Sequence, residues 1–271
     1  MTDLVDELLN NAQQNDILGK ITQKGAFGVT KYELDVDGHL SRVLGKGEGH
    51  YTTIKVRQNF LWSSKIRRYI INILKQTITK FLSKYTSAAP EVLVVGLGNG
   101  NMVCDSLGNL VCRDLCVIDK SIAQQLGIGR LSYLMPGVSG VTGIDSFDLI
   151  EATIRKTTPC IVCIIDSLTA TSIDRLGLTF QCSDAGIVPG NGVGNGRHRL
   201  CFETLGVPVV SVGVPLLIGI QDLCHGLDIE HSIYQHFTPK EIDFVIGRCA
   251  KIVGCAINES IYTKDILDIY K

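Results

Sequence analysis

Short apolar runs that alternate with amphipathic stretches constrain the fold of this chain most strongly. Five runs have the length and composition of buried strands: Val92–Val95, Leu131–Met135, Cys160–Ile165, Thr179–Cys182 and Pro208–Val212. Stretches with helical periodicity lie before, between and after them: Ser63–Tyr85, Ser106–Val117, Phe147–Lys156, Leu168–Leu176 and Pro239–Ile257. Strands that alternate with helices form a mostly parallel sheet covered on both faces. We therefore predict a three-layer α/β/α sandwich, with residues 1–271 forming a single domain.

The first third of the chain has a different pattern. Residues 1–25 are polar and predict a helix or an N-terminal arm. After them, apolar and polar residues alternate around Leu34 and again around Ile54, with the turn-forming segment 37–49 between. Such alternation on both sides of a turn is typical of a β-hairpin.

Charge and hydropathy exclude several classes of protein. Lys and Arg total 26 against 27 for Asp and Glu, which gives no electrostatic footprint for nucleic acid or an anionic membrane. Mean hydropathy is +0.22, yet the longest apolar run, Val207–Ile220, is short and contains two prolines. We therefore expect no membrane-spanning helix. The N-terminus has no basic, apolar leader, so we expect a cytoplasmic protein. Its ten cysteines lie mostly in apolar runs and are expected to be reduced packing residues.

A glycine cluster, VVGLGNGN over residues 94–101, lies where a predicted strand meets a helix. One interpretation is a dinucleotide-binding turn, with Asp119 as the ribose-binding acid. Against it, Asn101 replaces the third glycine of that motif, and Asp105 lies where a phosphate would be repelled.

Two aspartates follow predicted parallel strands. Asp105 comes after the glycine cluster and Asp166 ends the run CIVCIID. Each has a structural alternative as a helix N-cap. If the fold brings the two carboxyls together, one pKa rises and the pair supplies an acid and a base. The same pair could hold a divalent metal.

The most glycine-dense stretch, residues 183–199, carries Asp184, Arg197, His198 and Arg199. It is either a loop that lines a substrate site or a surface connection. Guanidinium groups suit carboxylates, so the two arginines could bind acidic residues of a substrate.

Five motifs in order resemble one known family. VVGLGNGNMVCDSLG is similar to V-V-G-L-G-N-x-x-V-T-P-D-A-L-G, and MPGVSGVTGID to A-P-G-V-x-G-I-T-G-I-E. IIDSLTATSIDR is similar to I-D-A-L-A-A-R-S-x-E-R, SDAGIVPGNGVGN to S-D-T-G-I-x-P-G-S-G-V-G-N, and ETLGVPVVSVGVP to E-T-L-G-V-P-V-I-A-I-G-V-P. The chain thus resembles the germination proteases of spore-forming bacteria over most of residues 27–257.

The resemblance implies an endopeptidase that degrades small acid-soluble spore proteins in the germinating spore. It implies catalytic roles for Asp105 and Asp166, a fold similar to hydrogenase-maturation proteases, and a homotetramer made as a zymogen. Substrate-binding or supporting roles are expected for Asn99, Asp145, Asp184, Gly192, Arg197 and Arg199.

Some positions depart from the family pattern. Thr171 stands in place of an arginine, and TDLV at residues 2–5 resembles the self-cleavage sequence T-D-L-A so near the N-terminus that only three residues would be removed. We expect no cofactor. The alternatives are a metal-dependent peptidase with Asp105, Asp145 and Asp166 as ligands, a non-catalytic relative that acts as a binding protein, and a nucleotide-binding enzyme.

Overall fold

The computed structural model describes residues 2–11, 22–86, 89–190, 198–219 and 236–270. Its strands are β1 (Thr22–Ala26), β2 (Val29–Val36), β3 (Gly49–Val56), β4 (Glu91–Gly96), β5 (Arg130–Leu134), β6 (Ile161–Ala170), β7 (Thr179–Ser183), β8 (Val209–Gly219) and β9 (His236–Phe237). Its α-helices are α1 (Val5–Asn11), α2 (Gly38–Leu44), α3 (Ser64–Leu82), α4 (Leu107–Arg113), α5 (Lys120–Leu126), α6 (Ser139–Thr142), α7 (Ser146–Thr157), α8 (Phe202–Leu205), α10 (Ile242–Ile261) and α11 (Lys264–Tyr270).

All described strands form one sheet with the order β1-β2-β3-β7-β8-β6-β4-β5, and β9 pairs with β8. The pairs β4–β5, β4–β6 and β6–β8 are parallel. Strands β1, β2, β3, β7 and β9 join by antiparallel pairing. The α/β class is confirmed. The expected mostly parallel sheet is wrong for the half formed by β7, β3, β2 and β1, because β7 is antiparallel to β8 and the N-terminal hairpin β2–β3 pairs antiparallel with β7.

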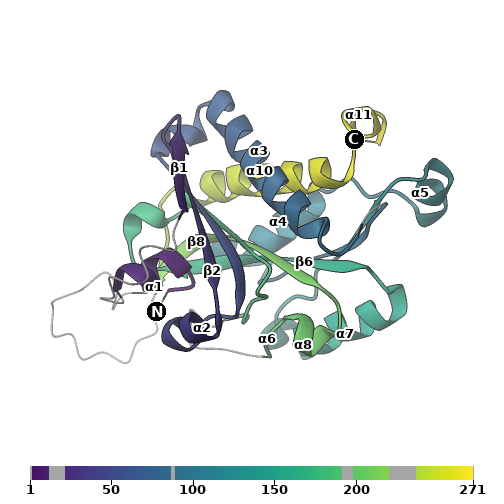
Figure 1. Ribbon diagram of the computed structural model, residues 1–271, viewed down its shortest axis with the longest axis horizontal. Coiled ribbons are helices and arrows are strands. Elements are labelled where there is room, and N and C mark those ends of the chain that lie inside the picture. The colour runs from purple at the N-terminus through teal and green to yellow at the C-terminus, as the bar shows by residue number, and fades with distance from the viewer. Residues whose placement is uncertain (1, 12–21, 87–88, 191–197, 220–235, 271) are drawn as a thin grey trace.

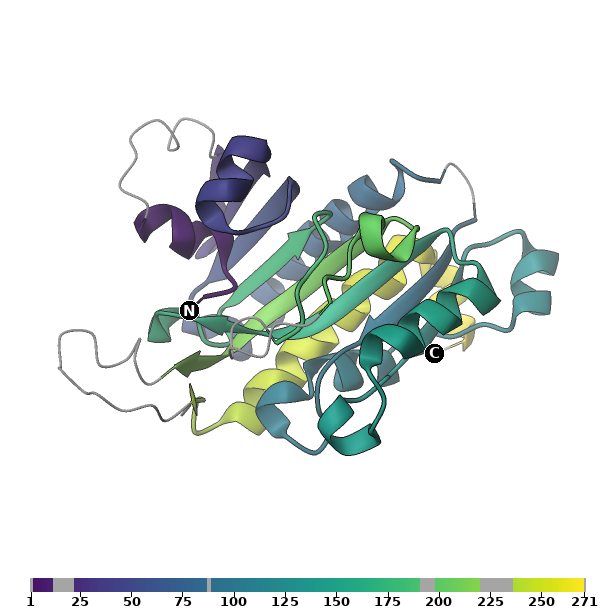
Figure 2. The same cartoon turned by 90° about the horizontal axis from the view of Figure 1, so that it is seen from below.

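Helices cover both faces of the sheet, as Figures 1 and 2 show. Helices α3, α4 and α10 lie on one face, and α6, α7 and α8 lie on the other. Side chains of β4 and β6 alternate between the two cores: Val94 and Cys163 pack toward α10, whereas Val95 and Ile164 pack toward α7. Burial on both faces explains why Val92–Val95 of β4 and Ile161–Ile165 of β6 are unbroken apolar runs. The three layers are confirmed.

Two local predictions are wrong. The predicted helix Leu168–Leu176 is instead the end of β6, followed by a single 3-10 turn at Ile173–Arg175. Strand β6 continues because β8 is long enough to pair with it as far as Ala170, past an irregularity after Leu168. The turn expected over 37–49 contains α2, which Asp37 caps by accepting hydrogen bonds from two backbone N–H groups.

The first residues pack against the body of the protein. Leu4 is fully buried, and the Asp3 N–H donates to the Thr169 carbonyl oxygen at 3.0 Å. Arg175, itself buried, forms an ion pair with Asp6 at 2.5 Å and lies 3.9 Å from Glu7. Residues 2–7 are therefore not a free arm, whereas α1 confirms the helix that the sequence also allowed for this region.

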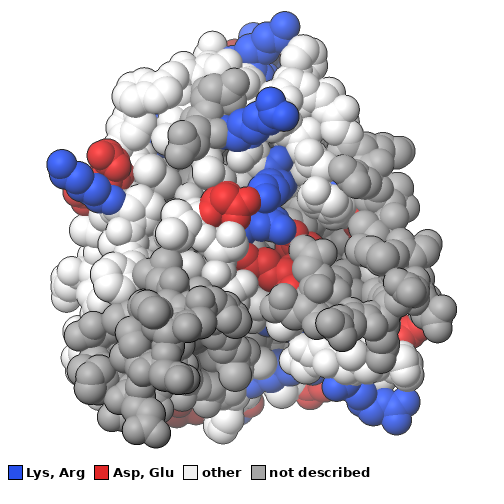
Figure 3. All heavy atoms as spheres, turned by 90° about the vertical axis from the view of Figure 1, so that its left-hand side faces the viewer, with Lys and Arg blue, Asp and Glu red and all other residues white. Residues whose placement is uncertain are grey.

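The described cysteines form no disulfide with one another, and most are buried, which confirms their expected packing role over this part of the chain. No helix in the described ranges is long and apolar enough to cross a bilayer. On the face shown in Figure 3, Lys and Arg side chains lie beside Asp and Glu side chains near the middle, so charges of both signs are mixed there.

Replacing Arg175 with Met should destabilise the fold near neutral pH by about 3–5 kcal/mol, because two buried carboxylates lose their counter-charge. Burial already raises the pKa of Asp6, with Arg175 acting against it. The loss should therefore shrink in mildly acidic buffer, where the Asp6 carboxyl becomes neutral. Urea unfolding of both proteins at the two pH values measures this. An equal loss at both would contradict the ion-pair account.

Candidate active site

Asp105 lies after strand β4, and Asp166 lies within the neighbouring parallel strand β6. Strand β4 ends at Gly96, which pairs with Ile165 of β6, the residue just before Asp166. Asp105 follows β4 through a short turn and closes the 3-10 helix η3 (Val103–Asp105). Because β4 ends level with the residue before Asp166, the chain that leaves β4 brings Asp105 to the same place. Asp105 follows its strand as predicted, whereas Asp166 does not end β6, which continues to Ala170 in its pairing with β8.

Neither aspartate is a helix cap. An Asp105 carboxylate oxygen accepts a hydrogen bond from the Asn99 backbone N–H at 2.7 Å, so it points back toward the glycine turn. Asp166 lies within β6 and accepts from the Ser167 N–H at 2.9 Å. Helix α4 begins at Leu107 with no side-chain cap bond from Ser106. Both side chains are therefore free of the structural role that the sequence offered as an alternative.

The two aspartates share cavity walls. Both line a cavity of about 460 Å³, whose other lining residues include Gly98, Asn99 and His236. Both also line a smaller adjoining cavity of about 60 Å³. Asp3, Leu168, Ile187 and Val188 line this small cavity and a third one of about 370 Å³. We call this series of three the cleft.

The surroundings of the two acids raise their pKa values to different extents. Burial, and then the charges of Asp105 and Asp3, raises the pKa of Asp166 well above its usual range. Burial also raises the pKa of Asp105, but the Asn99 N–H opposes this by stabilising the carboxylate. Asp166 is thus the group that holds a proton, and Asp105 the one that ionises first.

The glycines of residues 94–101 allow close packing at the site. A Cβ on Gly98, whose φ is +103°, would lie 2.0 Å from the Asp105 carbonyl oxygen. A Cβ on Gly96 would lie 2.4 Å from the Gly108 carbonyl oxygen. Asp119, the ribose-binding candidate, is instead the exposed N-cap of α5 and accepts from the Ser121 N–H. The structure thus gives these residues a packing and capping role, and the nucleotide interpretation loses its support.

The other predicted site residues separate into groups. Asn99 lines the 460 Å³ cavity of the cleft, and Arg199 lines the third one. Asp145 caps α7 by accepting from the Phe147 N–H at 2.9 Å. Asp184 pairs with Lys84 and accepts from the His50 N–H, joining β7 to β3 and α3. Gly192 and Arg197 lie outside the described residues.

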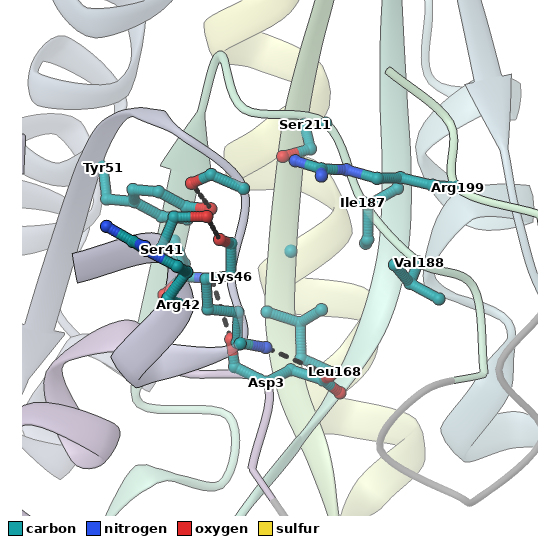
Figure 4. A pocket seen from close by; sticks show the side chains of 15 residues that line it. Asp3, Ser41, Arg42, Lys46, Tyr51, Leu168, Ile187, Val188, Arg199 and Ser211 are labelled. Carbon is teal, nitrogen blue, oxygen red and sulfur yellow. Dashed lines mark hydrogen bonds and ion pairs between the residues drawn. The ribbon is translucent and has the colours of Figure 1, made fainter. Parts of the chain in front are cut away.

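The three-aspartate metal set predicted for the alternative peptidase is not assembled, because Asp145 caps a helix and lines none of the three cavities. Within the described ranges, no three His, Cys, Asp or Glu side chains are grouped as metal ligands. The cleft is lined by the carboxylates of Asp105, Asp166 and Asp3 and by His236, and Asp3 is already engaged with Thr169 and, as Figure 4 shows, with Lys46.

Sequence reasoning missed three residues of the cleft. Asp3 was noted only for a cleavage-site resemblance, and Lys46 lies in what was predicted as a turn. Ser167 lines the small cavity, and its buried hydroxyl oxygen has no hydrogen-bond partner within the described part of the chain. A serine beside a strand-end aspartate was the available signal, since the family pattern has alanine there.

The profile of one protein family, described as germination protease, matches residues 4–237. The chain belongs to the germination protease family. Germination proteases of Bacillus mycoides (strain KBAB4) and Bacillus cytotoxicus are 37% and 36% identical to it over 232 and 223 residues. These matches cover 83% and 80% of this chain but 63% and 60% of the relatives, so the chain spans about three-fifths of their length.

One solved structure is also similar. It is a NiFe hydrogenase maturation protease from Thermococcus kodakarensis KOD1, with 17% identity and a TM-score of 0.36. The match covers 65% of this germination protease family chain and 97% of the other.

Replacing Gly98 with Ala should displace Asp105, because the new methyl group would meet the Asp105 carbonyl oxygen. Gly127 is a matched control, since its φ is also positive, at +63°, but a Cβ there meets nothing within 4 Å. We expect Gly98→Ala to lower the free energy of unfolding by roughly 1–3 kcal/mol more than Gly127→Ala. Urea unfolding compares them, and equal losses would contradict the contact.

Asp166→Asn should change how stability depends on pH. A raised pKa means that the folded state holds the proton more tightly than the unfolded state. Wild-type stability from this group is therefore complete below the carboxyl's ordinary pKa and is lost as pH rises through the raised one. The Asn variant lacks that loss, so its stability relative to wild type should increase across this window. Unfolding measured over a pH series tests this, and a constant difference would refute it.

Proposed function

We propose that this chain is an endopeptidase that begins the degradation of small acid-soluble spore proteins when a spore germinates. Membership of the germination protease family supports this proposal. The observation that carries it is the pair Asp105 and Asp166, which line the same cavities and differ in their tendency to hold a proton. Such a pair can supply a base and an acid in one site.

In the proposed mechanism, Asp105 is the general base. Its carboxylate, oriented by the Asn99 N–H, removes a proton from the water that attacks the peptide carbonyl carbon. Asp166, kept protonated by its buried site, donates to the carbonyl oxygen and stabilises the charge that develops there. When the tetrahedral intermediate collapses, the C–N bond breaks, the proton that Asp105 took from water passes to the leaving amine, and Asp166 recovers its proton from the hydroxyl group. The Ser167 hydroxyl lines the same small cavity and is available as a further donor.

The family resemblance extends the proposal to regulation and assembly. The self-cleavage sequence T-D-L-A matches residues 2–5, which puts the scissile bond between Asp3 and Leu4. Asp3 lines the same small cavity as Asp166, which supports cleavage of this segment. We further propose a zymogen, a homotetramer and action in the spore core.

Asp105→Asn and Asp166→Asn should each lower the rate of cleavage of a small acid-soluble spore protein by about 10²–10⁴-fold, because general acid–base catalysis contributes about that much. Asp119→Asn is the control, since Asp119 is an exposed helix cap with no place in the cleft. Cleavage is followed by mass spectrometry of the fragments, and circular dichroism verifies folding.

Undiminished cleavage by a folded Asp166→Asn variant would refute the mechanism. A chelator added to the wild type separates the metal-dependent alternative. The proposed mechanism predicts that activity survives chelation, whereas loss of activity that a divalent metal restores would favour that alternative.

A further inference from the structure

Helix α3 has five basic residues and no acidic residue. Helix α10, which packs beside it on the same face of the sheet, adds two basic and two acidic residues (Figure 1). In a chain whose formal net charge is -1, these two helices thus carry seven Lys and Arg against two Asp and Glu. The near-balance over the whole chain, from which the sequence predicts no nucleic-acid partner, therefore conceals an uneven distribution. We call the outer surface of α3 and α10 the basic face.

Four cations of α3 lie on this outer surface. The side chains of Arg68 and Lys75 are 55% and 42% exposed, and Lys65 and Lys80 are also exposed. They lie outside because the buried side chains of α3 form one apolar stripe that packs into the core. From Lys65 to Lys80 the helix is about 22 Å long, at a rise of 1.5 Å per residue. The basic face therefore presents a row of positive charge.

Few carboxylates neutralise this row. Arg68 and Lys75 share a single one, that of Glu259 in α10: an Arg68 nitrogen donates to it at 2.9 Å, and the Lys75 ammonium lies 4.0 Å from the same oxygen. Within the described part of the chain, no carboxylate lies within ion-pair distance of Lys65 or Lys80. The face therefore keeps a surplus of positive charge.

The positions between and after these cations are polar. Gln76 and Thr79 of α3 are exposed, as is Ser83 at its end. Helix α3, which the structure describes throughout, exposes no large apolar side chain. An amphipathic helix on a bilayer needs apolar side chains that enter it. A phosphate backbone instead takes hydrogen bonds from amides and hydroxyls as well as contacts from Lys and Arg. This chemistry favours nucleic acid over a membrane surface.

The length of the row suits a regular polyanion. Double-stranded DNA carries about one negative charge per 1.7 Å of its axis, so a stretch as long as the row carries about 13 of them. All four cations can therefore meet phosphates at the same time. None of them lines the cleft, so a duplex on the basic face leaves the cavities of Asp105 and Asp166 unobstructed at their walls.

We propose that the basic face binds the phosphate backbone of double-stranded nucleic acid without reading its sequence. Lys65, Arg68, Lys75 and Lys80 form the contacts to phosphate. This binding is independent of peptide hydrolysis, because its residues lie outside the cleft. It holds the protein against nucleic acid while the cleft acts on a polypeptide.

Fluorescence anisotropy of a short labelled DNA duplex, titrated with the full chain at several salt concentrations, tests the proposal. Each neutralised phosphate contributes about 0.9 to the fall of log K with log salt, so four contacts predict a slope of about −3 to −4. The double variant Lys65→Gln/Lys80→Gln should weaken binding about tenfold or more at low salt and reduce the slope by about 2. Duplexes of two unrelated sequences should bind equally, since phosphate contacts carry no sequence information.

A second variant tests the same face in the opposite direction. Glu259→Gln removes the carboxylate that Arg68 and Lys75 share, so it should tighten binding of the duplex. The matched control is Lys120→Gln/Lys156→Gln, which removes two exposed charges from α5 and α7 and should keep wild-type affinity. Circular dichroism verifies that each variant folds.

Three outcomes would overturn the proposal. A wild type that does not bind the duplex at low salt refutes it, as do equal losses in the two double variants. Equally tight binding to phosphatidylserine vesicles refutes the choice of nucleic acid. The Lys65→Gln/Lys80→Gln variant should cleave a free small acid-soluble spore protein at the wild-type rate, so this proposal and the peptidase function fail separately.

Discussion

The parallel pairing of β4 with β6 is the constraint on which the proposed site depends. Its register puts Gly96 opposite Ile165, so that the chain leaves β4 beside the position where Asp166 stands. The turn after β4 then folds tightly enough to bring Asp105 to the same cavity. Both strands are buried on both faces, which fixes the register because a slip by one residue would exchange the two cores. The carboxyl pair is a consequence of that packing.

A second set of contacts ties the N-terminal residues to the cleft. The segment around Asp3 forms hydrogen bonds with Thr169 of β6 and Gln181 of β7. The buried ion pair of Asp6 with Arg175 holds the same segment in place. The charge of Asp3 in turn raises the pKa of Asp166. The first residues therefore influence both the shape and the protonation of the site. Their removal or displacement is expected to change each of these.

Several site residues could be predicted from the sequence because local pattern determines them. Asp105 and Asp166 follow apolar strand runs, and a strand end in a parallel sheet is where side chains gather. Asp145 and Asp119 are also acidic, yet they cap helices. A single sequence does not distinguish a capping aspartate from one in the candidate site. The segment after Leu168 was predicted as a helix because its pairing partner, β8, lies far along the chain.

The sequence by itself determined the α/β class, the three layers and the apolar runs that Asp105 and Asp166 follow, because apolar periodicity and the order of the elements are local properties. Tertiary structure alone decided the mixed strand directions, since the partner of β7 is a hairpin more than a hundred residues earlier. It also decided which acid holds the proton, and it placed Lys46, Arg199 and Asp3 around one cavity. Burial and charge proximity between distant segments set these features, and no local pattern encodes them.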